Sequence, residues 1–270
     1  MDTIETVRDF YNNFVDGEWN RIVDRPEFLL TCRMFSRYIK PGDKVLDIGG
    51  GPGRYSLYLS GKGCDVTLLD LSEANVAFAK ECGRELGLSI NAVCGDAREA
   101  DALVNGQFDR VLLMGPMYHL LEEADRITAV KAALNLLKPG GIIFISFINL
   151  FAGVIYYMKI APDALTWENE AVYIEKVIAK EDYAGDAFTK AVFMEQGKIL
   201  PFMSQFPLEK LHLFGQEGVT SPCEKNIMSQ PPEIVESWLD LCEKLWEREE
   251  LLSYSEHLMY VGRNIMGGVH

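Results

Sequence analysis

The fold of this chain is decided by Val45-Leu46-Asp47-Ile48-Gly49-Gly50-Gly51-Pro52-Gly53-Arg54-Tyr55-Ser56. An aliphatic run ends in an acid, a glycine-rich turn follows, and a helical pattern begins near Tyr55. This layout is typical of a strand that delivers a nucleotide-like ligand to a helix N-terminus. The glycines form G-x-G-x-G, whereas the dinucleotide fingerprint needs glycine at position 54 or 56, where Arg54 and Ser56 stand. The spacing therefore disfavours a nicotinamide dinucleotide.

Working outward from this stretch, strand and helix patterns alternate four times between residues 41 and 150. The pattern predicts a doubly wound, mostly parallel α/β sheet with right-handed crossovers. Two further strand patterns near the C-terminus complete a predicted seven-stranded sheet. We expect the strands at Lys44–Ile48, Asp65–Leu69, Ile90–Val93, Phe108–Met114, Ile142–Ile148, Leu208–Phe214 and His257–Gly262.

The rest of the chain predicts additions to this core. Helices are expected at Thr3–Val15, Pro26–Ile39, Asp163–Lys180 and Pro232–Leu252, with a further strand at Phe188–Met194. The predicted domain organisation is an N-terminal helical cap (1–40), a cofactor-binding core (41–150), an inserted substrate cap or lid (151–206), and the C-terminal part of the core sheet (207–270).

Charge and cysteine usage narrow the class of partner. The chain of 270 residues has 40 acidic and 26 basic residues and a formal charge of −14, without a basic cluster, which disfavours nucleic acid as a partner. Six cysteines without a C-x-x-C pair predict reduced thiols, and the N-terminus lacks the pattern of a secretory signal. We expect a cytoplasmic protein that acts on a small molecule.

One apolar stretch, from Ile142 to Ile160, is long enough to cross a bilayer. The alternative is a buried strand over 142–148 that continues into an apolar lid helix from about Phe151. Ser146, Asn149 and the preceding Lys-Pro-Gly-Gly turn favour the second interpretation, so no stable membrane insertion is predicted. Peripheral contact with a lipid or an apolar substrate stays open.

Several motifs together resemble those of class I S-adenosylmethionine-dependent methyltransferases. They are the glycine stretch, Asp70 at the end of the second strand, Gly95-Asp96-Ala97, Phe108–Met114 and the Pro-Gly-Gly turn at 139–141. The run Gly115-Pro116-Met117-Tyr118-His119-Leu120 is similar to a bacterial small-molecule subgroup, loosely akin to the quinone-biosynthesis enzymes. The resemblance implies a Rossmann-like methyltransferase fold, S-adenosylmethionine as cofactor and S-adenosylhomocysteine as product.

The resemblance implies a set of cofactor-binding residues, which also have physical readings. Glycines let the backbone approach a ligand closely. Asp47 either accepts a hydrogen bond from the cofactor ammonium group or holds the loop in place through hydrogen bonds to its backbone. Arg54 either reaches a carboxylate or covers the surface of the sheet. An acid at position 70 can take both ribose hydroxyls. Leu71 would lie against the adenine ring, and Asp96 would accept a hydrogen bond from the adenine amino group. The predicted set is Asp47, Gly49, Gly50, Gly51, Gly53, Arg54, Asp70, Leu71, Asp96, Ala97, Met114 and Gly115.

Tyr118 and His119 are the candidate catalytic residues, because the family's loop after the fourth strand borders the transferable methyl group. They would orient the acceptor or remove its proton, and a base is needed only for an acceptor that arrives protonated. In the alternative interpretation, His119 only bonds a neighbouring loop. His212 and His257 are interpreted as structural, and with no ligand cluster at metal spacing we predict no metal.

The predicted function is therefore methyl transfer from S-adenosylmethionine to a small molecule. Aromatic residues in the two caps favour an apolar or aromatic acceptor, although core packing explains many of them equally well. They are Tyr11, Phe14, Trp19, Phe151, Tyr156, Tyr157 and Trp167. Two alternatives stay open: an NAD-dependent Rossmann oxidoreductase and a non-catalytic S-adenosylmethionine-binding protein.

Overall fold

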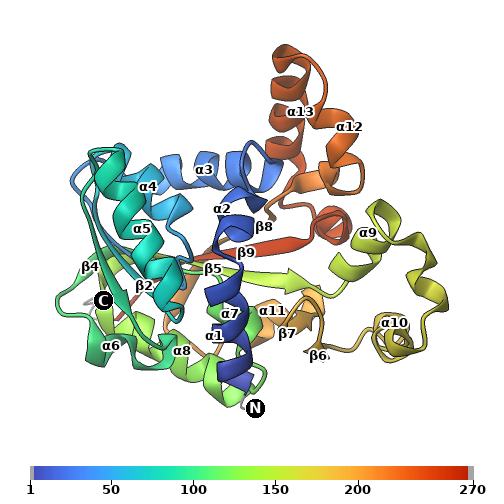
Figure 1. The fold of residues 1–270 in the computed structure, drawn as a ribbon, viewed down its shortest axis with the longest axis horizontal. Coiled ribbons are helices and arrows are strands. Elements are labelled where there is room, and N and C mark those ends of the chain that lie inside the picture. Colours follow the sequence, from blue (N-terminus) through green and yellow to red (C-terminus); the bar gives the residue numbers. More distant parts are fainter. Residues whose placement is uncertain (1–2, 267–270) are drawn as a thin grey trace.

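The computed structural model describes residues 3–266 as a central sheet covered by helices on both faces (Figure 1). The five amino-terminal strands are parallel, as the alternating pattern predicts, and they run in the order β3-β2-β1-β4-β5. Strand β9 pairs antiparallel with β5, and β8 pairs antiparallel with β9. The strands are β1 (Lys44–Ile48), β2 (Asp65–Asp70), β3 (Ile90–Cys94), β4 (Phe108–Leu113), β5 (Leu137–Asn149), β6 (Tyr183–Asp186), β7 (Lys190–Met194), β8 (Leu208–Gly215) and β9 (His257–Asn264).

The sheet has nine strands in the described residues, two more than the predicted seven-stranded sheet, and one of these two, β7, is the further strand predicted at Phe188–Met194. The additional pair is the antiparallel hairpin β6–β7 of the inserted segment. Strand β4 pairs with β5 only as far as Ile145, and β9 occupies the other edge of β5. The edge beyond β4 is therefore free, and β7 pairs there with Ile148 and Asn149.

Helices from different parts of the chain cover the two faces of the sheet. One apolar core packs α6, α8 and α11 against strands β1, β4 and β5. The other face is covered by α3, α4 and α13, with α5 over β2 and β3. The helices are α1 (Thr3–Asn13), α2 (Val15–Arg21), α3 (Pro26–Tyr38), α4 (Arg54–Gly61), α5 (Glu73–Glu85), α6 (Ala100–Leu103), α7 (Pro116–His119), α8 (Glu123–Leu136), α9 (Ala152–Lys159), α10 (Ala171–Ala179), α11 (Gln196–Met203), α12 (Glu224–Met228) and α13 (Pro232–Leu245).

Three helix predictions differ from the structure. The helix predicted over Thr3–Val15 divides at Phe14 into α1 and α2. The segment predicted as one helix over Asp163–Lys180 forms the short 3-10 helices η2 (Pro162–Thr166) and η3 (Glu168–Glu170) before α10. Helix α13 ends at Leu245 instead of Leu252, because Trp246 turns onto Phe214 and its carbonyl accepts from the Gly215 amide.

The apolar stretch at 142–160 forms the buried part of β5 and then α9, as the second interpretation predicts. Within residues 3–266, no helix has the length and apolar character required to cross a bilayer. Helix α9 and the segment through α10 project from the end of β5 (Figure 1). Helix α1 crosses in front of α7, so the N-terminal segment covers the carboxyl ends of the parallel strands (Figure 1).

Candidate active site

Two adjoining cavities lie at the carboxyl ends of the parallel strands. Both are lined by Glu18, Gly49, Gly51, Gly115 and Tyr118, so they form two ends of one crevice. The first cavity extends under α1 and is also lined by Ile4, Val7, Tyr11, Asp70, Leu71, Asn75, Gly95, Asp96, Ala97, Pro116, His119 and Leu120. The second extends toward β9 and is also lined by Arg21, Ile22, Glu27, Gly50, Pro52, Arg54, Tyr55, Met114, Ser146, Gln216 and His257.

The glycine loop has a backbone that favours glycine at three positions. Gly49, Gly51 and Gly53 all have positive φ, at 75°, 56° and 88°. A Cβ on Gly51 would meet no atom closer than 3.8 Å, so it would project into cavity space that a ligand needs. Gly53 lines neither cavity, and a Cβ there would lie 3.0 Å from the Cβ of Ala79. Gly51 therefore leaves room for a ligand, whereas Gly53 allows α4 to pack against α5.

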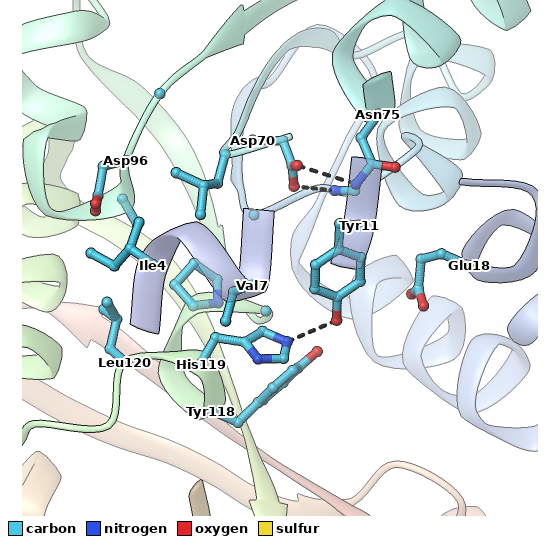
Figure 2. A pocket seen from close by; sticks show the side chains of 17 residues that line it. Ile4, Val7, Tyr11, Glu18, Asp70, Asn75, Asp96, Tyr118, His119 and Leu120 are labelled. Atoms are coloured by element: carbon cyan, nitrogen blue, oxygen red, sulfur yellow. Dashed lines mark hydrogen bonds between the residues drawn. The ribbon is translucent and has the colours of Figure 1, made fainter. Parts of the chain in front are cut away.

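The Asp70 carboxylate is fixed at the end of β2 and lines the first cavity. Its Oδ2 accepts from the Gly51 amide at 2.8 Å, and its Oδ1 accepts from the Ser72 amide at 2.9 Å. The Asn75 amide donates to Oδ1 at 3.2 Å, and the Asn75 oxygen is buried without a partner in the described residues (Figure 2). Burial raises the pKa of Asp70, and these hydrogen bonds oppose that rise. The pair offers rigid acceptors to a hydroxyl-bearing ligand.

Asp47 lies behind the glycine loop and lines neither cavity. Its Oδ2 accepts from the Ser56 hydroxyl at 2.7 Å, while Oδ1 is buried without a partner in the described residues. Burial raises the pKa of Asp47 to about 7 against the effect of Ser56, with a further rise from Asp70. The hydrogen bond to Ser56 supports the interpretation that Asp47 holds the loop in place, and the orphaned oxygen retains capacity for a cationic ligand.

Asp96 lies on the side of the first cavity opposite Glu18 (Figure 2), and Leu71 and Ala97 line the same cavity. The Asp96 carboxylate is already paired with Arg98, at 2.7 Å between Oδ2 and Nη2. It also accepts from the Arg98 amide at 2.9 Å. Asp96 therefore starts the 3-10 helix η1 (Ala97–Glu99), and its carboxylate stands at the cavity wall.

Arg54 and Met114 line the second cavity. The Arg54 guanidinium lies 3.4 Å from the centre of the Trp19 ring, and its Nε donates to the Trp19 carbonyl at 3.2 Å. This stacking holds the Arg54 guanidinium against α2, and both of its hydrogen bonds in the described residues go to the Trp19 carbonyl rather than to a carboxylate. Met114 is buried between the apolar core and the cavity, beside Gly115.

His119 is buried and uses both ring nitrogens (Figure 2). Its Nδ1 lies 2.9 Å from the Lys190 carbonyl, an acceptor, so we assign the proton to Nδ1. The Tyr11 hydroxyl then donates to Nε2 over 2.7 Å. Burial lowers the pKa of His119 to about 4, so the ring is neutral at pH 7. Burial also raises the pKa of the neighbouring Tyr118, whose side chain lines both cavities.

The second cavity contains a charged cluster that sequence reasoning missed. Arg21 donates through Nε to Glu18 at 3.0 Å and through Nη1 to Glu27 at 2.8 Å. His257 lies 2.7 Å from Glu217, between Nδ1 and Oε1, and its Nδ1 lies 4.0 Å from Glu27. Glu18 and Arg21 are three residues apart in α2, but Glu27, Glu217 and His257 come from a helix, a loop and a strand elsewhere in the chain, so no local spacing indicates the whole cluster.

Glu27, Glu217 and His257 lie close enough to share a cation, with candidate ligand atoms within 4.8 Å of one another. These atoms already serve other groups, because Glu27 pairs with Arg21 and Glu217 accepts from His257. The sequence shows no metal-ligand spacing because the three residues meet only in the folded chain. The absence of a metal from the mechanism stays a prediction.

The aromatic residues predicted to enclose the acceptor mostly lie elsewhere. Among the seven, only Tyr11 lines either cavity. Tyr157 packs in a separate apolar cluster of the inserted segment. No residue of 151–206 lines either cavity, but the segment contacts the site through the Lys190 carbonyl and the Phe188 ring on His119, and Tyr118 packs against its apolar cluster. The N-terminal helices therefore cover the described crevice.

Sequence comparison shows which kind of domain the glycine loop and the strands around it resemble. Residues 45–141 match a family model described as a methyltransferase domain. The region from the glycine loop to the start of β5 is therefore similar to a methyltransferase domain. The chain is 28% identical over 177 residues to a ubiquinone biosynthesis O-methyltransferase of Cronobacter sakazakii, covering 64% of this chain and 65% of the relative. It is also 34% identical over 129 residues to the Pseudomonas aeruginosa protein of the same name, and this match covers 45% of this chain and 54% of the relative.

The match thus spans between about half and two thirds of these curated relatives. Solved methyltransferase structures share the fold over nearly the whole chain. Magnesium protoporphyrin IX methyltransferase from Synechocystis aligns with a TM-score of 0.59 and 14% identity, covering 97% of this chain and 100% of the other. The N-methyltransferase NodS from Bradyrhizobium japonicum aligns with a TM-score of 0.57 and 14% identity, covering 98% and 99%.

Proposed function

We propose that the protein is a methyltransferase that binds S-adenosylmethionine along the crevice and transfers its methyl group to a small molecule. The observation that carries the proposal is the Asp70 carboxylate, held by two backbone amides and facing the first cavity. An acceptor pair in this position suits the two hydroxyls of a ribose. The curated relatives are named as O-methyltransferases, and NodS was solved with S-adenosylhomocysteine.

The residues of the crevice fit the different parts of the cofactor. In the proposal, Asp70 and Asn75 bind the ribose, and Leu71, Asp96 and Ala97 enclose the adenine. The open space beside Gly51 admits the methionine portion, and the orphaned oxygen of Asp47 supports binding of its ammonium group. Gly49, Gly50, Gly53, Arg54, Met114 and Gly115 complete the predicted set by shaping the loop and the cavity walls.

Bound S-adenosylmethionine supplies a methyl group on a positively charged sulfur. The protein has to align an acceptor with that methyl group and exclude water, and both tasks lower the barrier of an in-line displacement. Tyr118 lies where the two cavities meet and is the residue we propose to orient the acceptor. His119 would support this arrangement by holding Tyr11 of α1 over the crevice.

The domain roles follow from the same geometry. We propose that residues 1–40 form the cover of the crevice and 41–150 form the cofactor-binding core. Residues 207–270 complete the sheet, and 151–206 would act as a cap only through the hairpin that contacts His119. All six cysteines are free, which supports the predicted cytoplasmic location. The formal charge of −14 supports a small-molecule partner rather than nucleic acid.

Calorimetric titration of the full chain with S-adenosylhomocysteine and with NADH tests the proposal. We expect saturable binding of the first and no binding of NADH, because the loop lacks the dinucleotide spacing. Incubation with S-adenosylmethionine and a panel of phenols, amines and thiols should then release S-adenosylhomocysteine. Binding of NADH alone would overturn the cofactor assignment, and cofactor binding without turnover for every acceptor would favour a non-catalytic binding protein.

A further inference from the structure

His257 is held at the wall of the second cavity by a single carboxylate. It begins β9, where it pairs with Ile148 of β5. Its Nδ1 donates to Oε1 of Glu217 at 2.7 Å, and its backbone amide donates to Oε2 of the same side chain at 3.0 Å. The Glu217 side chain is only 5% exposed. Two hydrogen bonds to one buried carboxylate fix the direction of the imidazole ring.

The other ring nitrogen of His257 is available to a ligand. Within residues 3–266, Nε2 forms no hydrogen bond. The side chain is 15% exposed and lines the second cavity, so its accessible part faces that cavity. A polar group in such a position has capacity that the protein itself does not use.

The charges around His257 determine which kind of group it can bind. Burial alone would lower the pKa of His257, but the carboxylates of Glu27 and Glu217 outweigh it and raise the pKa to about 9. Arg21 acts in the opposite direction, and Tyr118 faces the same cavity. At neutral pH the ring is therefore an imidazolium whose Nε2–H is a charge-assisted donor.

The carboxylates of the cluster are already occupied. Glu18 and Glu27 accept from the Arg21 guanidinium, and Glu217 accepts from His257. The unused capacity at this wall is thus a donor, which suits the oxygen of an acceptor better than an ammonium group. The Tyr118 ring, whose centre lies 6.1 Å from that of His257, provides an aromatic face beside the donor.

We propose that the second cavity binds the methyl acceptor and that His257, held by Glu217, donates a hydrogen bond to the reacting oxygen of a phenol. This assignment rests on the proposed methyl transfer and names the acceptor class for it. His257 is then a catalytic residue, and Glu217 is a positioning residue that acts through it. The nearby imidazolium stabilises the phenolate form of the acceptor relative to the phenol.

The chemistry balances without a base or an oxidant. The phenol releases its proton to water on binding, and His257 stabilises the resulting oxyanion. The oxygen then forms a bond to the methyl carbon while the carbon–sulfur bond breaks and the sulfur keeps the electron pair. The product is an aryl methyl ether, which no longer carries the negative charge that favoured binding to His257.

The assignment can be tested by NMR of the full chain labelled at its four histidines, His119, His212, His257 and His270. The probes are phenol, catechol and 4-hydroxybenzoate, added to protein saturated with S-adenosylhomocysteine. We expect the His257 ring signals, assigned with a His257→Gln variant, to shift with these phenols and not with anisole or aniline. His212 is the internal control, because it pairs with Glu247 and lines neither cavity.

Two variants separate positioning from binding. Glu217→Gln removes one negative charge but retains an acceptor for Nδ1–H, so we expect the pKa of His257 to fall while S-adenosylhomocysteine still binds. In His257→Gln we expect phenol-dependent turnover to fall at least tenfold with unchanged cofactor affinity. The matched His212→Gln variant should leave both quantities unchanged.

Several results would overturn the acceptor assignment. They are the absence of a His257 shift with all three phenols, a shift with aniline only, and full phenol turnover in His257→Gln. Binding of Zn²⁺ that is lost in His257→Gln would instead make the Glu27–Glu217–His257 cluster a metal site. Failure of S-adenosylhomocysteine to bind the unmodified protein would contradict the proposed function itself, which distinguishes the two failures.

Discussion

The two ends of the crevice each contain a histidine next to Tyr118, and the two rings have opposite properties. His119 in the first cavity has its pKa lowered to about 4, chiefly by burial. Burial acts on His257 in the second cavity as well, yet Glu27 and Glu217 raise its pKa to about 9. Burial alone therefore does not determine the charge of a histidine, because the charge of its partners decides the direction.

The difference extends to what each ring can do. His119 bonds the Lys190 carbonyl and the Tyr11 hydroxyl, so it joins β7 to α1 and has no free nitrogen. This geometry favours the interpretation in which His119 links neighbouring segments. A role as general base stays a prediction. His257 has one nitrogen committed to Glu217 and one facing a cavity, which is the arrangement of a ligand-binding group.

The largest expected effect is on stability as a function of pH. The folded-state pKa of His257 is raised from 6.5 to about 9. The contribution of His257 to the free energy of unfolding is therefore complete below pH 6.5, and it is lost as the pH rises toward 9. The shift corresponds to at most about 3 kcal/mol. The pH dependence for His119 has the opposite sign, because its pKa is lowered. Its contribution to the free energy of unfolding is complete above pH 6.5 and is lost as the pH falls toward 4.

Denaturant unfolding between pH 4 and 9 measures how the free energy of unfolding changes on the acid side and on the alkaline side. We expect His257→Gln to flatten the decline on the alkaline side and to leave the acid side unchanged. His212→Gln provides the control for replacing a strand histidine. An alkaline slope that persists in His257→Gln would show that the two histidines do not differ in charge as described.

Replacing Asp70 should affect the cofactor end of the crevice. Asp70→Ala removes the proposed ribose acceptor, and the loss of two hydrogen bonds should weaken binding of S-adenosylhomocysteine by about 1–3 kcal/mol, or about 5- to 150-fold. Calorimetry measures this change. Asp65→Ala is the matched control, because Asp65 is exposed at the opposite end of the same strand. An unchanged dissociation constant would refute the role of Asp70.

Replacing His119 distinguishes a linking residue from a base. His119→Ala leaves the Lys190 carbonyl and the Tyr11 hydroxyl without their partner, so we expect the free energy of unfolding to fall by about 2 kcal/mol. The pH profile of kcat between 6 and 9 should keep its shape, since His119 does not titrate there. Unchanged stability together with the loss of a basic limb in that profile would restore the interpretation of His119 as a base.

The smallest expected effect comes from Tyr11→Phe. This change removes one hydroxyl and leaves Nε2 of His119 without its donor, which should cost about 1 kcal/mol. Hydrogen exchange of the amides in α1 measures the effect locally, because this bond joins α1 to the crevice. We expect faster exchange in α1 and no change in β9. Equal effects on both segments would contradict the independence of the two ends.

Much of the cofactor end could be predicted from the sequence. The strand Lys44–Ile48 and the position of Asp70 at the end of the second strand agree with the structure, because glycine turns and strand periodicity are local signals. The parallel topology then places the strand ends along one edge. The inserted segment was less predictable, since the pairing of β7 depends on an edge of β5 that β4 leaves free.

The acceptor end illustrates why the remaining residues were missed. Arg21 and Glu27 belong to the N-terminal helices. Near the other end of the chain, Glu217 comes shortly after β8, and His257 is the first residue of β9. His257 alone reads as a strand histidine, which is why it was interpreted as structural. Its role as a ligand-facing donor depends on the carboxylates that surround it in three dimensions.

The sequence by itself determined the parallel sheet, the glycine loop and the acids at the strand ends, because these depend on backbone conformation and on short-range periodicity. The tertiary structure alone decided the charges of the two histidines and the lining of the second cavity. Electrostatic interactions act through space and depend on burial, so groups distant in sequence set each other's protonation only after the chain has folded.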